Sequence, residues 1–124
     1  MDIVDRLWAD ASEVLFISKE EFVRDLQEWN ITPLVVDGVL AFAGLRKGAA
    51  FHCVSFHTGH KITRKMLCDF IGPIIAEHGY ATTKTPKEDE RQQRFNIAFG
   101  FQFVGEDEYD VHYRIERLRG SPLH

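Results

Sequence analysis

The chain has 124 residues and a formal net charge of −4, and 44% of its residues are hydrophobic and 12% aromatic. This length suits one ordinary domain, and the apolar content argues against disorder over most of the chain. The acidic balance argues against a general nucleic-acid binder, which needs a basic face, and the apolar runs are too short to span a membrane.

The N-terminus and the cysteines both predict a protein that stays in a cytoplasm. The first ten residues, MDIVDRLWAD, carry acids where a signal peptide is basic, and they suit a short helix instead. The two cysteines, Cys53 and Cys68, lie in apolar runs and form no CxxC pair. That pattern is typical of buried thiols in a reducing compartment.

The first strong helix signal begins at Ser18. Ser18 and Glu21 form a capping box, in which each side chain bonds to the backbone amide of the other residue. Apolar residues then recur at helical spacing. We therefore expect a helix over about 19–29.

The next stretch, residues 33–57, predicts three antiparallel strands joined by tight turns. Asp37-Gly38 is a two-residue hairpin signal, because a type I′ turn needs positive φ at both of its central positions. A second turn ends at Gly48. The high apolar content indicates that at least one strand is covered on both faces. We expect the strands near 33–36, 39–45 and 49–57.

The second half of the chain predicts a helix, a strand, a second helix and a pair of strands. Apolar residues recur every four positions across 61–79, so this stretch is the first helix. Gly72-Pro73 should kink that helix or end its first part, and Gly79 should close it. The later elements are expected over 80–86, 87–99 and 101–118, the last of which holds both strands.

This order predicts one α+β domain with a mixed sheet over 1–118, and a C-terminal tail over 119–124. An antiparallel meander followed by helix, strand, helix, strand and strand resembles the GNAT acetyltransferase fold. The segment RFNIAFGFQFVGED, with Gly100-Phe101 at its turn, is similar to that family's second motif. The resemblance covers about residues 18–117 and implies a GNAT-like sheet.

The resemblance also implies where a cofactor would bind. In the family, the loop before the main helix reads Arg/Gln-x-x-Gly-x-Gly and cradles the pyrophosphate of acetyl-CoA. Thr58, Lys61 and Thr63 stand at its three defining positions here, and Gly59 stands at a variable one. A Cβ at positions 61 and 63 narrows the approach of the backbone to a phosphate, whereas Lys61 and Arg64 offer charge. These five residues are the candidate cofactor-binding set.

The catalytic positions that the resemblance implies are not filled. The family's usual general acid, a Tyr four residues before the glycine of the Gly-Phe step, is replaced by Asn96. An amide cannot donate a proton at a useful pH. The family's base is often a Glu on the meander, but Asp37 is the only acid between residues 33 and 57, and the turn accounts for it. The sequence thus leans against an enzyme, with no catalytic residue and no cofactor expected.

A narrower resemblance favours virion assembly. The segments ITRKML and GPIIAEHGYATTKTPKEDERQQRFNIAFGF are similar to those of small GNAT-fold head-assembly and internal virion proteins of short-tailed phages. This implies a non-catalytic accessory role in the host cytoplasm or the virion, with phage structural or assembly proteins as partners. The alternative is an acyl-CoA-dependent N-acetyltransferase with a degenerate pyrophosphate loop and acetyl-CoA as its cofactor.

The histidines between residues 52 and 60 resemble a metal cluster only by their proximity. Strand periodicity places His52 and His57 on opposite faces, and roughly four strand residues, about 13 Å, separate Cys53 from His57. Only His57 and His60 converge, which is too few ligands for zinc. We expect no metal, and a metal or small-ligand sensor is the least favoured alternative.

Three cations, Lys61, Arg64 and Lys65, open the predicted helix where its dipole disfavours them. A solvated face is the favoured interpretation, with Lys65 and Asp69 as an i,i+4 pair. The alternative is contact with an anion or an acidic partner. The acid run GEDEYD on a second copy is one such partner, which leaves a homo-oligomer open.

Overall fold

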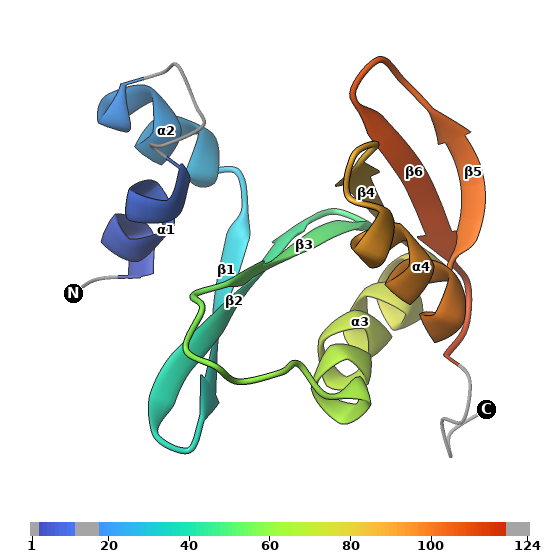
Figure 1. Cartoon of the computed structure of the whole chain (residues 1–124), viewed down its shortest axis with the longest axis horizontal. Coiled ribbons are helices and arrows are strands. Elements are labelled where there is room, and N and C mark those ends of the chain that lie inside the picture. Colours follow the sequence, from blue (N-terminus) through green and yellow to red (C-terminus); the bar gives the residue numbers. More distant parts are fainter. Residues whose placement is uncertain (1–2, 12–17, 119–124) are drawn as a thin grey trace. The chain divides into compact units, whose positions relative to one another are not determined.

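The computed structural model describes residues 3–11 and 18–118. Within these ranges the chain forms helices and strands in the predicted order (Figure 1). Their bounds are α1 (Ile3–Ala11), α2 (Lys19–Leu26), β1 (Asn30–Val36), β2 (Val39–Lys47), β3 (Ala50–Ser55), α3 (Arg64–His78), β4 (Ala81–Pro86), α4 (Glu90–Phe99), β5 (Gln102–Glu106) and β6 (Asp110–Ile115).

The strands hydrogen-bond in the order β1-β2-β3-β4-β6-β5. β1 is antiparallel to β2, and β6 is antiparallel to both β4 and β5. β3 and β4 are parallel, with Ala50 opposite Thr82, and α3 lies in the connection between them. A parallel pair needs such a crossover, whereas antiparallel pairs close through short turns. The mixed sheet confirms the predicted α+β class.

The chain divides into two compact units, one formed by Met1–Lys47 with His52–Ile62 and the other by Gly48–Phe51 with Thr63–His124. β3 contributes residues to both. The single domain expected over 1–118 stays a prediction, and the tail over 119–124 lies outside the described residues. No helix within residues 3–11 and 18–118 is both long and apolar enough to cross a membrane.

In the first unit, α1 and α2 share one core with the β1–β2 hairpin. The hydroxyl of Ser18 accepts a hydrogen bond from the Glu21 amide at 3.2 Å, as the capping box predicts. α2 ends earlier than expected, because the Trp29 amide bonds to the carbonyl of Leu26 in a tighter turn. The buried centre of this core consists of Leu7, Leu26, Ala43 and Phe56.

The β1–β2 hairpin begins earlier than the sequence predicts. Asn30 pairs with Arg46, so β1 starts before residue 33 and β2 runs past residue 45. The turn itself is as predicted, because Asp37 and Gly38 have φ values of 52° and 76°. Pairing between strands, which no local signal encodes, sets the longer ends.

In the second unit, α3 packs against β4, and α4 packs against β5 (Figure 1). Ile71 and Ile74 of α3 are fully buried. The helix runs without a break through Pro73, so the predicted end of its first part does not occur. It begins at Arg64 rather than near residue 61, and it closes as predicted at Gly79, whose φ is 83°.

Candidate functional site

The loop after β3 leaves the strand sooner than predicted. β3 ends at Ser55, and His57 has a φ of 56°, which few non-glycine residues adopt. The hydroxyl of Ser55 accepts a hydrogen bond from the His57 amide at 3.2 Å and holds this turn. The prediction of a strand through residue 57 is therefore wrong, and strand periodicity does not describe where His57 points.

The side chains of the loop are engaged with the first unit. The hydroxyl of Thr58 lies 2.7 Å from Nδ1 of His60, and Nε2 of the same ring lies 3.6 Å from the carboxylate of Asp37. His60 thus links the loop to the β1–β2 turn. Across residues 3–11 and 18–118, no three His, Cys, Asp or Glu side chains gather as metal ligands would.

Gly59 allows the loop backbone to adopt a left-handed conformation. Its φ is 86°, which favours glycine, and a Cβ built there would meet no other atom within 4 Å. Conformation, and not lack of room, therefore explains the glycine. Thr58, Gly59 and Lys61 belong to the first unit, and Thr63 and Arg64 belong to the second.

The first turn of α3 is capped by its own side chain. Thr63 has an extended backbone, and its hydroxyl accepts a hydrogen bond from the Met66 amide at 3.1 Å. The Leu67 amide bonds to the carbonyl of Thr63 at 3.1 Å. A helix start attracts anions through its unpaired amides. The Thr63 hydroxyl occupies one of them, so a phosphate there would have fewer donors than in a glycine loop.

The two cations of this turn are used differently. Lys65 lies 2.7 Å from Asp69, and that hydrogen bond and charge raise the pKa of the lysine. This confirms the predicted i,i+4 pair. The guanidinium of Arg64 lies over the ring of Phe99, 4.7 Å from its centroid. Stacking on an aromatic face holds the Arg64 charge at the junction of α3 and α4.

Asn96 is a structural residue. It is 2% exposed, and its side-chain amide donates to the hydroxyl of Thr85 at 2.8 Å. Its carbonyl oxygen accepts from the Gln92 side chain at 3.0 Å. The backbone carbonyl of Asn96 also receives the Phe101 amide at 2.9 Å, which forms the Gly-Phe step. The Asn96 side chain therefore links α4 to β4. As an amide, it cannot act as a general acid at this position.

Burial favours the neutral, protonated form of two side chains, Cys53 and Tyr113. Burial raises the pKa of the Cys53 thiol to about 12. Burial also raises the pKa of Tyr113, whose side chain belongs to the core of the second unit. A nucleophilic cysteine needs a lowered pKa, so Cys53 has the opposite property.

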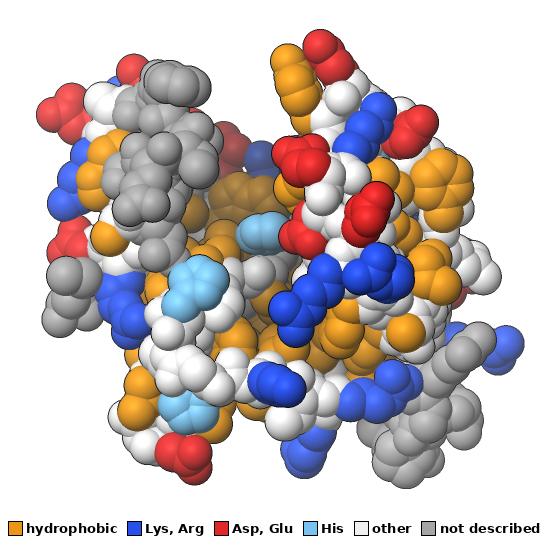
Figure 2. All heavy atoms as spheres, in the orientation of Figure 1, with side chains coloured by type: hydrophobic (Ala, Val, Ile, Leu, Met, Phe, Trp, Pro, Cys, Tyr) orange, Lys and Arg blue, Asp and Glu red, His pale blue; other side chains and the backbone are white. Residues whose placement is uncertain are grey.

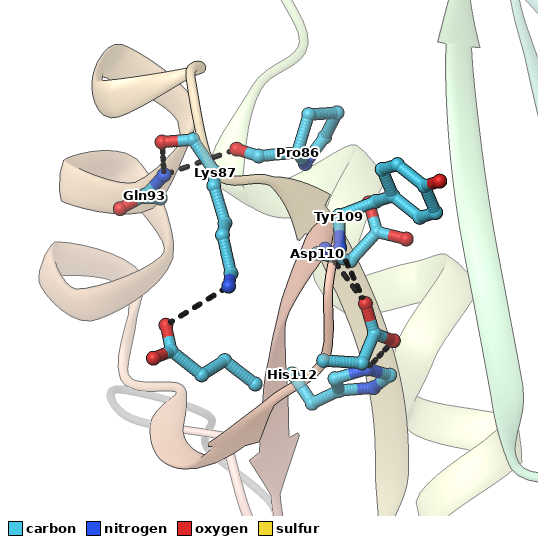
Figure 3. A network of polar contacts seen from close by, with 8 residues as sticks. Pro86, Lys87, Gln93, Tyr109, Asp110 and His112 are labelled. Atoms are coloured by element: carbon cyan, nitrogen blue, oxygen red, sulfur yellow. Dashed lines mark hydrogen bonds and ion pairs between the residues drawn. The ribbon is translucent and has the colours of Figure 1, made fainter.

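The sequence did not reveal a polar network around the β5–β6 turn (Figure 3). Asp107 accepts hydrogen bonds from His112 Nε2 at 2.6 Å and from the Tyr109 and Asp110 amides at 2.9 Å each. Lys87 approaches Glu106 at 3.9 Å. The hydrogen bonds from His112 and from the Asp110 and Tyr109 amides hold the pKa of Asp107 well below its usual range. The run GEDEYD gave a signal of charge, but not of these pairings.

The chain resembles known proteins in its three-dimensional structure. No family model and no curated protein matches its sequence. The N-acetyltransferase PseH of Campylobacter jejuni matches at 11% identity with a TM-score of 0.66, over 94% of this chain and 92% of that one. A ribosomal-protein-alanine N-acetyltransferase from Brucella melitensis matches at 11% identity and TM-score 0.67, over 92% and 94%.

A GNAT-family acetyltransferase from Listeria monocytogenes is also similar, at 16% identity and a TM-score of 0.58, over 89% of this chain and 76% of that one. At such identities the likeness shows the fold. The chain therefore has the GNAT fold, as the order of its elements predicted.

Proposed function

We propose that the chain binds acetyl-CoA and transfers its acetyl group to an amine. The observation that carries this proposal is the match of the whole described fold to N-acetyltransferases, over more than nine tenths of each chain in two cases. Fold likeness alone does not fix an activity, so the residues of the chain have to be weighed beside it. They favour anion binding more than acid catalysis.

The cofactor fits the charge of the α3 start but not the glycine-lined approach of the family. Arg64 is held over Phe99 at the start of α3, where its guanidinium can face a pyrophosphate. Thr63 keeps its cap and leaves fewer free amides. When bound, acetyl-CoA would supply a thioester to an attacking amine, and the CoA thiolate that leaves would take a proton from solvent. In this proposal the guanidinium of Arg64 provides charge for binding the pyrophosphate.

The proton steps follow from Asn96. Because its amide is locked between Thr85 and Gln92, position 96 supplies no proton to the leaving sulfur. Burial keeps the Cys53 thiol protonated as well. Solvent then accepts and supplies the protons, and only an amine that is already neutral reacts. The rate should rise with pH until the acceptor amine itself is deprotonated.

The release of CoA thiol in the presence of amines tests this proposal. Peptides with free N-termini and amino sugars are suitable acceptors, each assayed from neutral pH upward. We expect slow release that follows the pKa of the acceptor. If the rate of release showed the same apparent pKa with every acceptor, that pKa would belong to a base on the protein. This result would contradict the proposed proton steps. No release above the rate without protein would contradict the activity.

A non-catalytic role is the second candidate, and the buried Asn96 favours it. It keeps the sequence-based proposal of an accessory role in phage virion assembly, with phage structural proteins as partners in the host cytoplasm. The three structural relatives favour the acetyltransferase instead. Copurification with virion components from infected cells, without acetyl transfer, would support the second candidate over the first.

A further inference from the structure

The loop after β3 and the β1–β2 turn bring three side chains into a continuous line of contacts. The hydroxyl of Thr58 lies 2.7 Å from Nδ1 of His60, and Nε2 of that ring lies 3.6 Å from the carboxylate of Asp37. Figure 2 shows a histidine side chain beside an acidic one at the end of the β1–β2 hairpin. All three residues belong to the first unit. A hydroxyl, an imidazole and a carboxylate in this order are the parts of a nucleophilic triad.

One tautomer of the His60 ring suits both of its contacts. A neutral imidazole has one nitrogen that accepts a proton and one that carries a hydrogen. With the hydrogen on Nε2, the ring points its N–H toward the charge of Asp37, and Nδ1 accepts from the hydroxyl of Thr58. The accepting nitrogen is then at the hydroxyl and the carboxylate is behind the ring, which is the arrangement that activates a hydroxyl nucleophile.

The backbone on both sides of Thr58 has a left-handed conformation. His57 has a φ of 56° and Gly59 has a φ of 86°. A left-handed histidine costs free energy, and such residues concentrate at functional sites. A Cβ built at Gly59 would meet no other atom within 4 Å, so there is room beside Thr58 for a small acyl group. The amide of Gly59 follows Thr58 in the chain, as an oxyanion-hole amide follows the nucleophile in α/β-hydrolases.

We propose that Thr58 is a nucleophile that hydrolyses small carboxylic esters, with His60 as its base and Asp37 as the residue that positions His60. As Oγ1 of Thr58 attacks the ester carbonyl, its proton passes to Nδ1 of His60. The bond to the leaving alcohol breaks, the alcohol takes that proton, and the acyl group stays on Thr58. Water then attacks the acyl group and gives one proton to His60. The carboxylic acid leaves, and that proton returns to the Thr58 oxygen.

Hydrolysis of p-nitrophenyl acetate by the full chain, with neither CoA nor an amine present, tests the proposal. We expect p-nitrophenol to form faster than without protein, and mass spectrometry to find an acetyl group on Thr58. The inference does not depend on the proposed acetyl transfer, and this assay can fail while acetyl-CoA is still bound and used. A wild-type rate no higher than the rate without protein would overturn the proposal.

Variants of the loop separate this nucleophile from other reactive side chains. Thr58→Val keeps the shape of the side chain without its hydroxyl and should remove the hydrolysis and the acetyl group, whereas Thr58→Ser should keep both. His57→Asn is the matched control, because it removes an exposed imidazole beside the site and asparagine tolerates a positive φ. It should hydrolyse the ester like the wild type. Thermal melts show whether the variants fold. Full hydrolysis by Thr58→Val, or acetyl groups only on other residues, would overturn the proposal.

The role of Asp37 is tested by its charge. Its side chain is 86% exposed, so water and salt screen its effect on His60. Asp37→Asn should therefore lower the rate by about tenfold, compared with about 10⁴-fold in a buried triad. Asparagine suits the same turn, so the melting temperature should stay unchanged. High salt should slow the wild type but not Asp37→Asn. An equal rate for the wild type and Asp37→Asn would overturn the positioning role.

Discussion

The side-chain amide of Asn96 in α4 donates to the hydroxyl of Thr85 in β4 at 2.8 Å, and both residues are buried. This bond joins the two elements at the position where a GNAT enzyme usually has its acid. It gives the polar side chain at this position a structural role. A buried amide must be paired, and here its donor and its acceptor are both used.

Asn96→Ala should lower the free energy of unfolding by about 2 kcal/mol, because the buried Thr85 hydroxyl loses its partner. Urea denaturation measures the change. Arg91→Ala on the exposed side of α4 is the control and should change stability by less than about 0.5 kcal/mol. Equal effects of the two variants would contradict a structural role for Asn96.

Two glycines of α3 should respond to alanine in opposite directions. Gly79 has a φ of 83° at the helix end, so Gly79→Ala should cost about 1 kcal/mol through backbone strain alone. Gly72 is inside the helix, and a Cβ there would meet Leu118 at an ordinary 3.9 Å. Gly72→Ala should therefore stabilise by about 0.5–1 kcal/mol. Thermal melts of the two variants measure both changes. If Gly79→Ala also stabilised the protein, a left-handed cap at Gly79 would be contradicted.

The Asp107 network predicts a dependence of stability on pH. Hydrogen bonds from His112 and from the Asp110 and Tyr109 amides lower the pKa of Asp107 on folding. Its contribution is therefore present above the unfolded pKa and is lost as pH falls below about 4. Asp107→Asn imitates the protonated acid, so the variant should be less stable at pH 7 and should approach the wild type in acid. Glu108→Gln, on the same turn, is the control. A difference that stays constant down to pH 2 would contradict the lowered pKa.

Cys53 should resist alkylation in the folded protein. With a pKa raised to about 12, only about one thiol in 10⁴ is ionised at pH 8, and the thiolate is the reactive form. Iodoacetamide should therefore modify the Cys68→Ser variant slowly until urea unfolds it, as mass spectrometry can follow. Rapid modification under native conditions would show that the pKa of the half-buried Cys53 thiol is not raised.

Local signals in the sequence predicted those parts of the fold that are themselves local. Ser18 with Glu21, Asp37-Gly38 and Gly79 each encode a cap or turn through their own backbone and side chains, and each is present as expected. Such features need no knowledge of the rest of the chain. The order of elements followed from them and predicted the GNAT fold.

Features that depend on distant partners were not predictable. Asn96 could be seen as a missing acid, but its bond to Thr85 depends on how α4 packs on β4. The stacking of Arg64 on Phe99 joins two helices in the same way. His57 was assigned to a strand because apolar content continues around it, whereas its positive φ turns the chain.

The most direct test of the central claim is a calorimetric titration of the protein with acetyl-CoA. The proposed acetyl transfer and the cationic start of α3 predict one site per chain with micromolar affinity. Arg64→Ala should weaken binding about tenfold, or about 1.4 kcal/mol, whereas Arg24→Ala on α2 removes the same charge and should not. The absence of heat at millimolar acetyl-CoA would contradict the proposed function and leave the non-catalytic role.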